Sequence, residues 1–547
     1  MTRMAAKAKT KSPRRARAAA STAMPLNDLH SGGMISTPLR SNYMQGENGV
    51  VWANWRPALR DARNEIQSSW DKAAARAIDI IQNSGWISGA IDQSIANTVG
   101  TGLRLKAAPE NRLFGLDNKA ARVWAKDCEQ RFENYCSNPL EIDIEGRRNF
   151  GQMQAAQFRM YFAFGETFAE FPWKRRLLNG TKVRLITANR ISRGDDLMRN
   201  IVQGVQMDDD GLPIAYNAVK RDKWLGDTEY LVRARDALFR TRVNHVFDGG
   251  PDQVRGITPL VPALRVAKQF DQLADATLMA ALIQSVFAAT IESDSPTEDM
   301  LAGLLTPQEQ AKMAVAGQSI WDGWFAAQSG WYDNATVDVG ITGRISHLFP
   351  GQKMEFHASE HPNGNYKEFA MYLLREIARC LGMTYESVTG DYAGATYSSV
   401  KLAVSEIFEV TKYRRKHIVA PFCQATYECW LEEEIEAGRI QFPGGLDAFY
   451  ANRTAACRAI WRGTPKPVAD DLKTAKSNEI YRNMGVITDE MIANDLGMDI
   501  EDVYDQRKRE KEMREELGLP DMYPAPTAAN GKPLADPADD NEDGPDA

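Results

Sequence analysis

The sequence predicts an α+β protein that is mainly α, because long stretches with apolar residues at helical spacing far outnumber the short strand-like ones. The strand-like stretches are concentrated in residues 166–232, and glycines stand where many of the elements end. The chain has 547 residues, 43% of them apolar and 25% charged, which is an ordinary globular composition. This length corresponds to about two to four domains.

The two ends of the chain differ from the rest in composition. Residues 1–45 are polar, and seven Lys and Arg residues precede the first acidic one, so we predict a disordered basic arm, with contact to DNA or a scaffold as the alternative. No apolar core follows these cations, which argues against a secretory signal. Residues 521–547 are dominated by proline and acidic residues and predict a disordered acidic tail.

The part that follows the basic arm is predicted to be helical. Trp52–Val99 has a helical pattern that stops at Gly100, and the strand-like Leu103–Lys106 comes next. Residues 119–137 and 149–164 have the spacing of amphipathic helices, and a glycine ends the second one. The residues expected on their buried faces are Val123, Phe132, Tyr135, Phe150, Met153, Phe158 and Phe162.

Short strand candidates then predict a small antiparallel sheet. They are Glu166–Trp173, Val183–Ile186, Ile201–Met207, Ile214–Val219 and Tyr230–Val232. Asp208–Gly211 supplies a turn between two of these strands. Its three consecutive aspartates could ligate a metal, but a solvated turn shortly before Pro213 is the more ordinary interpretation.

Two long helices are expected on either side of an irregular region. Thr258 can cap a helix whose first residue is Pro259 and which runs to about Ile291. Residues 292–356 are irregular and contain three tryptophans, and Tyr366–Leu381 forms the second helix. The second helix has one apolar stripe, which consists of Tyr366, Phe369, Leu373, Ile377 and Leu381.

Part of the first long helix raises the question of a membrane. Residues 273–291 are apolar and nearly long enough to cross a bilayer. Asp275 and Gln284 lie within this stretch, and a charged side chain is costly inside a membrane. We therefore prefer a packed helix in a protein assembly over a membrane channel.

The last third of the chain is predicted to be helical after one loop. The loop, residues 384–398, is small, polar and interrupted by glycines, and a third helix runs from about Ser399 to Ala437. This helix carries a basic cluster, which consists of Lys412, Arg414, Arg415 and Lys416. Further helices are expected near residues 470–484, 489–495 and 500–517, with glycines at 485, 497 and 518 between and after them.

Signs of catalysis are weak. The chain has no phosphate-binding GxxxxGK[ST] string, no GxGxxG and no GxSxG. His357-Ala358-Ser359-Glu360-His361 matches the HxxEH pattern of zinc hydrolases, but that chemistry needs a helix and Pro362 follows directly, so we prefer a chance match. Six cysteines without a Cys-x-x-Cys pair indicate reduced thiols. We expect no enzyme activity, no metal and no cofactor.

Several strings resemble the portal proteins of lambda-type tailed phages. They are Val254–Leu260, Leu374–Met383, Thr389–Asp391 and Tyr397–Ser399, with support from Asn97–Gly102, Gly165-Glu166 and Ile487–Leu519. The similarity extends over about residues 50–520, and the order of the strings is more specific than any one of them. The resemblance implies a portal-type fold, assembled as a ring of about twelve subunits at one capsid vertex.

The resemblance also implies a division of the chain. Between the arm and the tail it consists of a wing region (46–255), a stem helix (256–291), a clip (292–356), a second stem helix (357–383), a tunnel loop (384–398), a wing and crown helix (399–463) and C-terminal crown helices (464–520).

The resemblance assigns roles to three groups of residues. The stem residues are Pro259, Leu264, Tyr366, Phe369, Leu373 and Ile377. Clip residues that would dock the terminase are Trp321, Trp324 and Trp331. Tunnel-loop residues that would face DNA are Thr389, Gly390, Asp391, Tyr392, Thr396, Tyr397 and Ser398, with an ordinary connection between helices as the alternative.

The implied function is a DNA conduit in the virion, at the portal vertex of the capsid, assembled in the host cytoplasm. Implied partners are further copies of the chain, double-stranded DNA without sequence specificity, the terminase large subunit, capsid and scaffold proteins, and head-completion proteins. A net charge of -7 fits a duct, because about six to ten phosphate contacts would make DNA binding firm and stop it sliding. A zinc hydrolase, a packaging nuclease and a membrane channel are the rival interpretations.

Overall fold

The computed structural model of the protein describes residues 58–520, except residues 111–114, 116, 223–225, 287–289, 294–305, 309–310, 313–328, 331–335, 339–343, 347–351, 356–365 and 469–470. The basic arm, the acidic tail, the tryptophans Trp321, Trp324 and Trp331, the string His357–His361 and most of residues 292–356 lie outside the described residues. Contacts divide the chain after Arg60, and the elements below belong to the unit that begins at Asp61.

The first helical region differs from the single stretch expected over Trp52–Val99. Its described part is two helices, α2 (Ala62–Asn83) and α3 (Gly85–Thr98). The break lies at Ser84, where the backbone is extended and a new helix starts. The predicted strand after these helices is confirmed as β1 (Arg104–Ala107).

Two amphipathic helices follow as predicted, α5 (Asn118–Ser137) and α7 (Phe150–Phe164), and a left-handed Gly165 ends α7. The buried face of α5 consists of Ala121, Ala125, Cys128, Phe132 and Tyr135. The expectation that Val123 lies on this face is wrong, because its side chain is 65% exposed. Val123 is two residues from both Ala121 and Ala125, which places it on the opposite side of the helix.

The predicted small sheet is instead two antiparallel sheets, of three and four strands. The first has the order β3 (Arg184–Ile186), β2 (Glu166–Glu170), β8 (Val243–Phe247). The second has the order β4 (Ile201–Val202), β5 (Val205–Met207), β6 (Pro213–Asp222), β7 (Gly226–Arg233). The predicted turn at Asp208 is confirmed, since its carboxylate accepts hydrogen bonds from the amides of Asp210 and Leu212.

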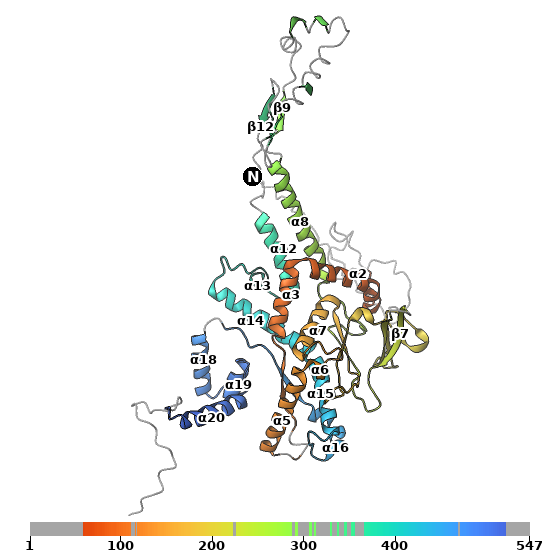
Figure 1. Cartoon of the computed structure of the whole chain (residues 1–547), viewed down its shortest axis with the longest axis vertical. Helices are drawn as coiled ribbons and strands as arrows, with labels where there is room; N and C mark the ends of the chain where they lie inside the picture. Colours follow the sequence, from red (N-terminus) through yellow and green to blue (C-terminus); the bar gives the residue numbers. More distant parts are fainter. Residues whose placement is uncertain are drawn as a thin grey trace, which may run out of the picture. The chain divides into compact units, whose positions relative to one another are not determined.

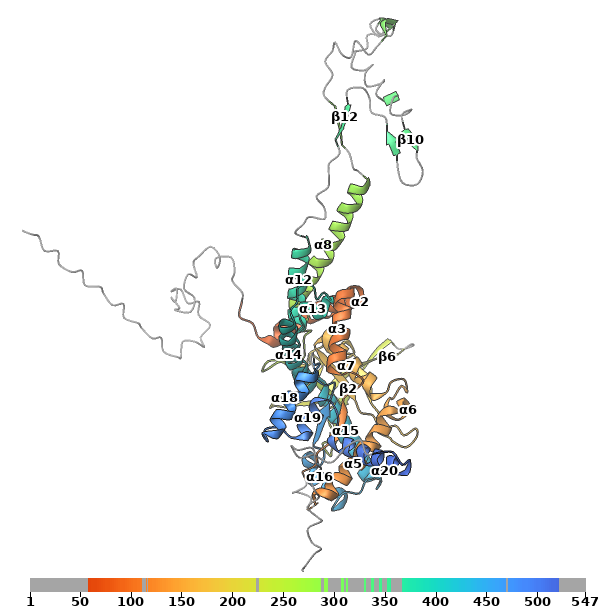
Figure 2. The ribbon, with the colours of Figure 1, turned by 90° about the vertical axis from the view of Figure 1, so that its left-hand side faces the viewer.

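The two long helices, α8 (Val261–Val286) and α12 (Tyr366–Leu381), lie side by side (Figures 1 and 2). α8 is shorter than expected: Pro259 precedes it, and Ile291 belongs to strand β9 (Thr290–Ser293), which pairs with β12 (Gln352–Glu355). The predicted cap is present, because the Thr258 hydroxyl accepts a hydrogen bond from the amide of Leu260.

The predicted third helix is continuous from Tyr397 to Glu436, in three parts. They are α14 (Tyr397–Arg414), a π-helical turn η4 (Arg415–Val419) and α15 (Ala420–Glu436). The range 399–463 is therefore not one helix, because short helices and a strand occupy its end. The elements after α15 are α16 (Gly445–Ala451), α17 (Arg453–Ala456), β13 (Ala459–Arg462), α18 (Asp471–Asn483), α19 (Asp489–Asp495) and α20 (Ile500–Glu516).

The three C-terminal helices confirm the predicted pattern, and the glycines between and after them, Gly485, Gly497 and Gly518, are left-handed. β13 pairs with β1, so the chain returns to its early part before these helices begin. The remaining short elements are α6 (Pro139–Ile142), η2 (Ala188–Arg190), η3 (Leu197–Arg199), β10 (Thr336–Asp338) and β11 (Arg344–Ser346).

Two apolar cores hold these elements together. The larger core joins α3, α5, α7, α12, α15 and the first half of α8. The smaller one lies between α2 and the strands of both sheets, with Trp70 and Phe164 stacked at its centre. Since the first half of α8 and the last half of α12 reach the larger core, both long helices are fixed at one end.

A buried ion pair links the first sheet to the start of α8. Glu166, the first residue of β2, and Arg255 are fully buried, with 2.6 Å between Oε1 and Nη2. Arg255 also donates to the carbonyls of Gln203 and Ala188, and Glu166 accepts from the amide of Gly256. Burial alone would raise the pKa of Glu166, but the charge of Arg255 and hydrogen bonds from His245 and Arg255 lower it to about 2.

Two glycines flank this ion pair and allow the backbones to cross. Gly165 has a φ of +81°, and a Cβ atom there would lie 2.0 Å from the carbonyl of Ile257. A Cβ atom on Gly256 would lie 2.3 Å from the carbonyl oxygen of Gly165. Only residues without a side chain fit this crossing, so the chain leaves α7 and enters α8 at one fixed point.

We expect Arg255→Met to lower the free energy of unfolding by about 3–5 kcal/mol, because it leaves the Glu166 carboxylate buried without a cation. Chemical denaturation measures this change. Arg184→Met is the matched control, because Arg184 on β3 pairs at 2.8 Å with Glu170, which lies on β2 as Glu166 does, and the Arg184 side chain is 41% exposed. The control should lose about 1 kcal/mol or less. Equal losses in the two variants would contradict the role of the Glu166–Arg255 pair as a buried anchor of the fold.

Gly165→Ala should prevent folding or leave the protein insoluble, because the new methyl group meets backbone rather than a movable side chain. Gly394→Ala is the control, since Gly394 has the same φ of +81° but open space around it. That variant should lose only about 1 kcal/mol. Expression yield and thermal unfolding distinguish the two, and a soluble, stable Gly165→Ala protein would refute the close crossing.

Candidate functional site

The predicted tunnel loop, residues 384–398, connects α12 to α14 and is only partly a loop. Tyr385–Thr389 forms the short helix α13, and Tyr397 and Ser398 already belong to α14. The prediction of one continuous loop is therefore wrong at both ends. Thr384 caps α13 through its hydroxyl, and the left-handed Gly390 ends it, so a local capping pattern accounts for the helix.

The segment begins at a fixed helix end. At the end of α12, the amide of Met383 donates to the carbonyl of Ala378 at 2.9 Å, and Gly382 has a φ of +69°. A Cβ atom on Gly382 would lie 2.8 Å from the Val410 side chain on α14. α12 and α14 therefore approach closely at the start of the segment, and α13 packs against α12 and α3.

The exposed part of the segment, residues 390–396, is held by short-range hydrogen bonds. Asp391 accepts from the amide of Ala393, and its own amide donates to the hydroxyl of Thr389. Thr396 forms a capping box with Ser399 at the start of α14. Tyr392 is 56% exposed at the middle of the segment. The side chain of Tyr397 lies outside the described residues, and that of Ser398 is exposed.

A buried arginine holds the base of this segment. Arg414, at the end of α14, donates to the carbonyl of Leu381 at 2.6 Å and to the hydroxyl of Ser94 at 3.4 Å. Its guanidinium lies over the Phe162 ring, 5.2 Å from the centroid. One cation thus ties α12, α3 and α7 to the long third helix.

The neighbouring Arg415 acts in the same way on α3. It donates to the carbonyls of Asn97 and Thr98 at the end of α3, and to the carbonyl of Thr464. Carbonyls at a helix end lack partners within the helix, and a cation there is favourable. Two members of the basic cluster seen in the sequence therefore serve the fold.

The charge of residues 384–398 is entirely acidic. Glu386 and Asp391 are its charged residues, and it has no Lys or Arg. Such a surface offers hydrogen-bonding hydroxyls and two carboxylates, but no cation to bind a phosphate.

The predicted stem residues divide into buried and exposed groups. Leu373 and Ile377 are buried in the larger core, while Pro259, Leu264 and Tyr366 are half-buried. Phe369, which belongs to the same predicted apolar stripe, is 54% exposed in the subunit. The large apolar residues exposed on the distal halves of α8 and α12 are Leu278, Met279, Leu282, Phe369 and Tyr372.

The described residues contain no cluster of three or more His, Cys, Asp and Glu residues that could hold a metal ion.

All six cysteines are free thiols, as the sequence indicates, and four of them are buried. Among the described helices, none combines the length and hydropathy that a membrane span requires.

A family model for phage portal proteins of the lambda family matches residues 49–415, more than half of the chain. The chain belongs to this family. The match covers the two long helices, the segment between α12 and α14, and the arginines beneath it. The resemblance inferred from the sequence strings is therefore confirmed.

Individual portal proteins agree over nearly the whole length. Portal protein B of Escherichia phage lambda is 27% identical over 511 residues, which cover 90% of this chain and 93% of the relative. The portal protein of Escherichia phage N15 is 26% identical over 488 residues, 87% of this chain and 90% of the relative.

Solved structures with some similarity also include portal and neck components. A chain in the neck of an empty gene transfer agent particle has a TM-score of 0.41 and 12% identity, covering 82% of this chain and 94% of its own. An HK97-family portal protein from Corynebacterium diphtheriae has a TM-score of 0.29 and 11% identity. The match covers 66% of this chain and 90% of that portal protein. Scores at this level do not establish a common fold by themselves.

The buried charged residues that hold the elements of this portal protein together were mostly not predicted from the sequence. Glu166 and Arg255 appeared only within strings, and Arg414 only in a basic cluster. The sequence contains one sign of their importance. Glu166 follows Gly165 and Arg255 precedes Gly256, and each glycine stands beside an apolar run. Their pairing across 89 positions could not be derived from spacing.

We expect Arg414→Met to destabilise the start of the segment between α12 and α14, because the Leu381 carbonyl and the Ser94 hydroxyl lose their buried donor. The cost is about 2–3 kcal/mol, with faster hydrogen exchange over residues 382–396. Lys412→Met is the control, since Lys412 is half exposed and its ion pair with Glu409 and its contact with the Phe408 ring both lie within the same helix. It should cost about 0.5 kcal/mol or less. Unchanged exchange in Arg414→Met would contradict the anchoring role.

Proposed function

We propose that this chain forms a closed ring at one vertex of a phage capsid and serves as the conduit through which double-stranded DNA is packaged and ejected. The observation that carries the proposal is the exposed apolar surface on the distal halves of α8 and α12. A monomer rarely exposes such a surface without a partner, and identical subunits can cover it head to tail. Family membership supports the same role.

The two halves of each long helix have different tasks in this proposal. The half near the body is buried in the subunit core and fixes the direction of the helix. The distal half presents Leu278, Met279 and Leu282 on α8, and Phe369 and Tyr372 on α12. These side chains would pack against the next copy, in a ring of about twelve subunits.

The segment between α12 and α14 would line the bore. Its lack of cations supports a passage rather than a binding site, because each phosphate contact adds salt-sensitive affinity. Thr389, Gly390, Asp391, Tyr392, Thr396, Tyr397 and Ser398 are the residues proposed to face the duplex. The fixed base beneath them would keep the bore at one diameter while DNA moves.

The remaining roles follow the family. We propose that residues 292–356, with Trp321, Trp324 and Trp331, form the clip that docks the terminase large subunit and later the head-completion proteins. The wing region would contact capsid and scaffold proteins and nucleate head assembly. The protein would reside in the virion after assembly in the host cytoplasm. It would be structural, with energy supplied by a separate ATPase, and family membership does not support a zinc hydrolase.

Purified protein should form closed rings, and Phe369→Asp combined with Tyr372→Asp should shift it to monomers, since charges would be placed in the subunit interface. Native mass spectrometry and electron microscopy measure both states. Tyr392→Asp is the control, because this tyrosine is similarly exposed, at 56%, but lies in the channel segment. Wild-type protein that stays monomeric at all salt concentrations, or rings that survive the double change, would refute the proposal.

Asp391→Lys should convert the channel segment into a phosphate-binding surface. We expect rings of this variant to retain DNA more tightly, with a salt dependence that steepens by about 0.9 for each additional phosphate that the lysines neutralise. The control is Asp209→Lys, an equal charge change in the exposed turn between β5 and β6. Fluorescence titration of a DNA duplex over a range of salt concentrations measures the effect. Equal behaviour of the two variants would place residue 391 outside the bore.

A further inference from the structure

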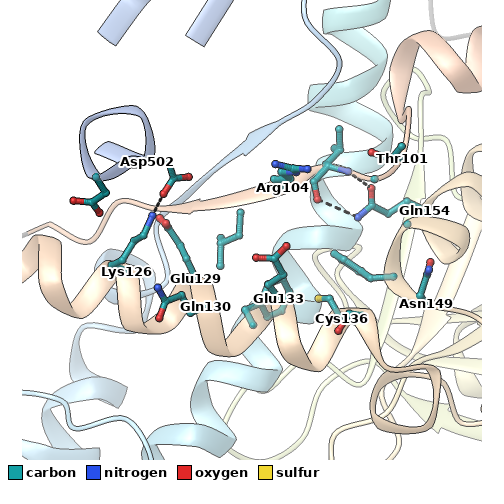
Figure 3. A pocket seen from close by; sticks show the side chains of 18 of the residues that line it. Thr101, Arg104, Lys126, Glu129, Gln130, Glu133, Cys136, Asn149, Gln154 and Asp502 are labelled. Carbon is teal, nitrogen blue, oxygen red and sulfur yellow. Dashed lines mark hydrogen bonds and ion pairs between the residues drawn. The ribbon is translucent and has the colours of Figure 1, made fainter. Parts of the chain in front are cut away.

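A polar cavity of about 730 Å³ lies between β1, α5, the start of α7 and α20, far along the chain from the tunnel segment (Figure 3). Its size falls in the range of sites that hold a small molecule or a short peptide. None of the residues proposed for the stem, the clip or the channel lines it. Its floor is a strand edge, and the pattern of hydrogen bonds along that edge indicates what fits there.

The register of β1 and β13 shows which main-chain groups face the cavity. Ala108 donates its amide to the carbonyl of Arg458, and the two residues lie in register with the pairs of β1 and β13. In an antiparallel pair, hydrogen-bonded and non-bonded residues alternate. Leu103, Leu105 and Ala107 therefore direct their amides away from β13, toward the free edge.

Side chains already occupy the outer two of these three positions. The Gln154 amide group accepts from the amide of Leu103 at 2.7 Å and donates to its carbonyl at 3.5 Å, as a neighbouring strand would. The Glu129 carboxylate accepts from the amide of Ala107 at 2.8 Å. Both side chains point toward the strand in Figure 3.

Leu105 lies between these two positions and lines the cavity. The register leaves its amide and carbonyl without a partner on β13. A residue of an extended segment could exchange two hydrogen bonds with it, as in strand addition. The space beside the strand and the pairing groups thus match a peptide rather than a compact molecule.

The charges around the cavity further restrict which kind of ligand can bind there. Its lining includes four cationic residues, Arg104, Lys126, Lys508 and Arg509, and five acidic ones, Glu129, Glu133, Asp502, Asp505 and Glu512. A nucleic acid or another polyanion would meet the carboxylates, and a polycation would meet the arginines. A segment with balanced charge fits this lining.

The outer wall of the cavity is held at one end only. Asp499 caps α20 and pairs with Lys106 at 2.7 Å and Arg462 at 2.6 Å, which fixes the start of the helix to β1 and β13. Lys126 pairs with Asp502 one turn later. No residue of α20 is buried, so apolar packing does not hold the rest of the helix in place.

We propose that residues 521–532 of the same chain occupy this cavity and pair with Leu105 as an added strand. Glu512 of α20 lines the cavity, and Pro520 follows eight positions later, so the next residues lie within a few extended residue lengths. Residues 521–532 contain one acid, Asp521, and one base, Lys532, which matches the balanced lining.

Prolines in this segment limit which residue can pair. Pro524 and Pro526 have no amide donor, while Tyr523 and Ala525 keep theirs and alternate with them. Either can face Leu105 while a proline points away from the strand. The bound segment would cover the inner side of α20 and hold the helix against the body.

Hydrogen exchange at single amides tests the pairing. The full chain is compared with a chain that ends at Pro520, which keeps every described element. The Leu105 amide should exchange about tenfold faster in the shortened chain, and a synthetic peptide of residues 521–532 should restore its protection. The Ala107 amide is the internal control, because Glu129 holds it in both. Equal exchange at Leu105, or an equal change at Ala107, would overturn the proposal.

Cross-linking tests which chain supplies the segment. Gln130 is exposed and lines the cavity, so Gln130→Cys with Ala525→Cys should join within one chain through a short bis-maleimide. Gln130→Cys with Ala538→Cys is the matched control and should join less. Mass spectrometry separates links within a chain from links between chains. Links mainly between chains would assign the cavity to a neighbouring copy, and links no stronger than the control would exclude the segment; either result overturns the proposal.

Discussion

The buried ion pair between Glu166 and Arg255 fixes how the first sheet is joined to the long helix α8. It joins the first strand of one sheet to the chain just before α8, and Arg255 also reaches two carbonyls between the sheets. A charge without its partner at this depth would cost several kcal/mol, so the two segments cannot separate cheaply. The glycine crossing beside the pair leaves room for only one approach. Together they set where α8 starts and in which direction it leaves.

Two further buried cations fix the base of the segment between α12 and α14. Arg414 and Arg415 point inward from the π-helical region of the third helix and bind carbonyls at the ends of α12 and α3. A π-helical turn shifts the register of the side chains that follow it, and such turns are frequent at functional sites. The exposed segment of residues 390–396 therefore stands on a rigid base, although its own contacts are local. If this segment lines the bore as proposed, its solvated surface and fixed base would keep the passage open while DNA moves.

The two long helices each combine a half that is buried in the subunit with a half that is exposed. One half of each is part of the core, which gives the subunit its own stability. The other half carries apolar side chains that the subunit leaves uncovered. α18, α19 and α20 are a further case, with Ala493 as the single buried residue among them. These are the two places where the proposed contacts, with other copies at the long helices and with residues 521–532 at α20, would cover the exposed surface.

Elements whose signals are local could be predicted from the amino-acid sequence. Glycine stops, the cap at Thr258, the turn at Asp208 and the apolar periodicity of α5, α7 and α12 depend on neighbouring residues, and the ordered strings identified the portal family. Features that depend on residues far apart in the chain could be seen only in the folded structure. It divided one expected sheet into two, because β2 pairs with β8 some eighty positions away. It also placed Arg414 inside and Phe369 outside, since burial depends on which surfaces meet, and spacing along one helix does not contain that information.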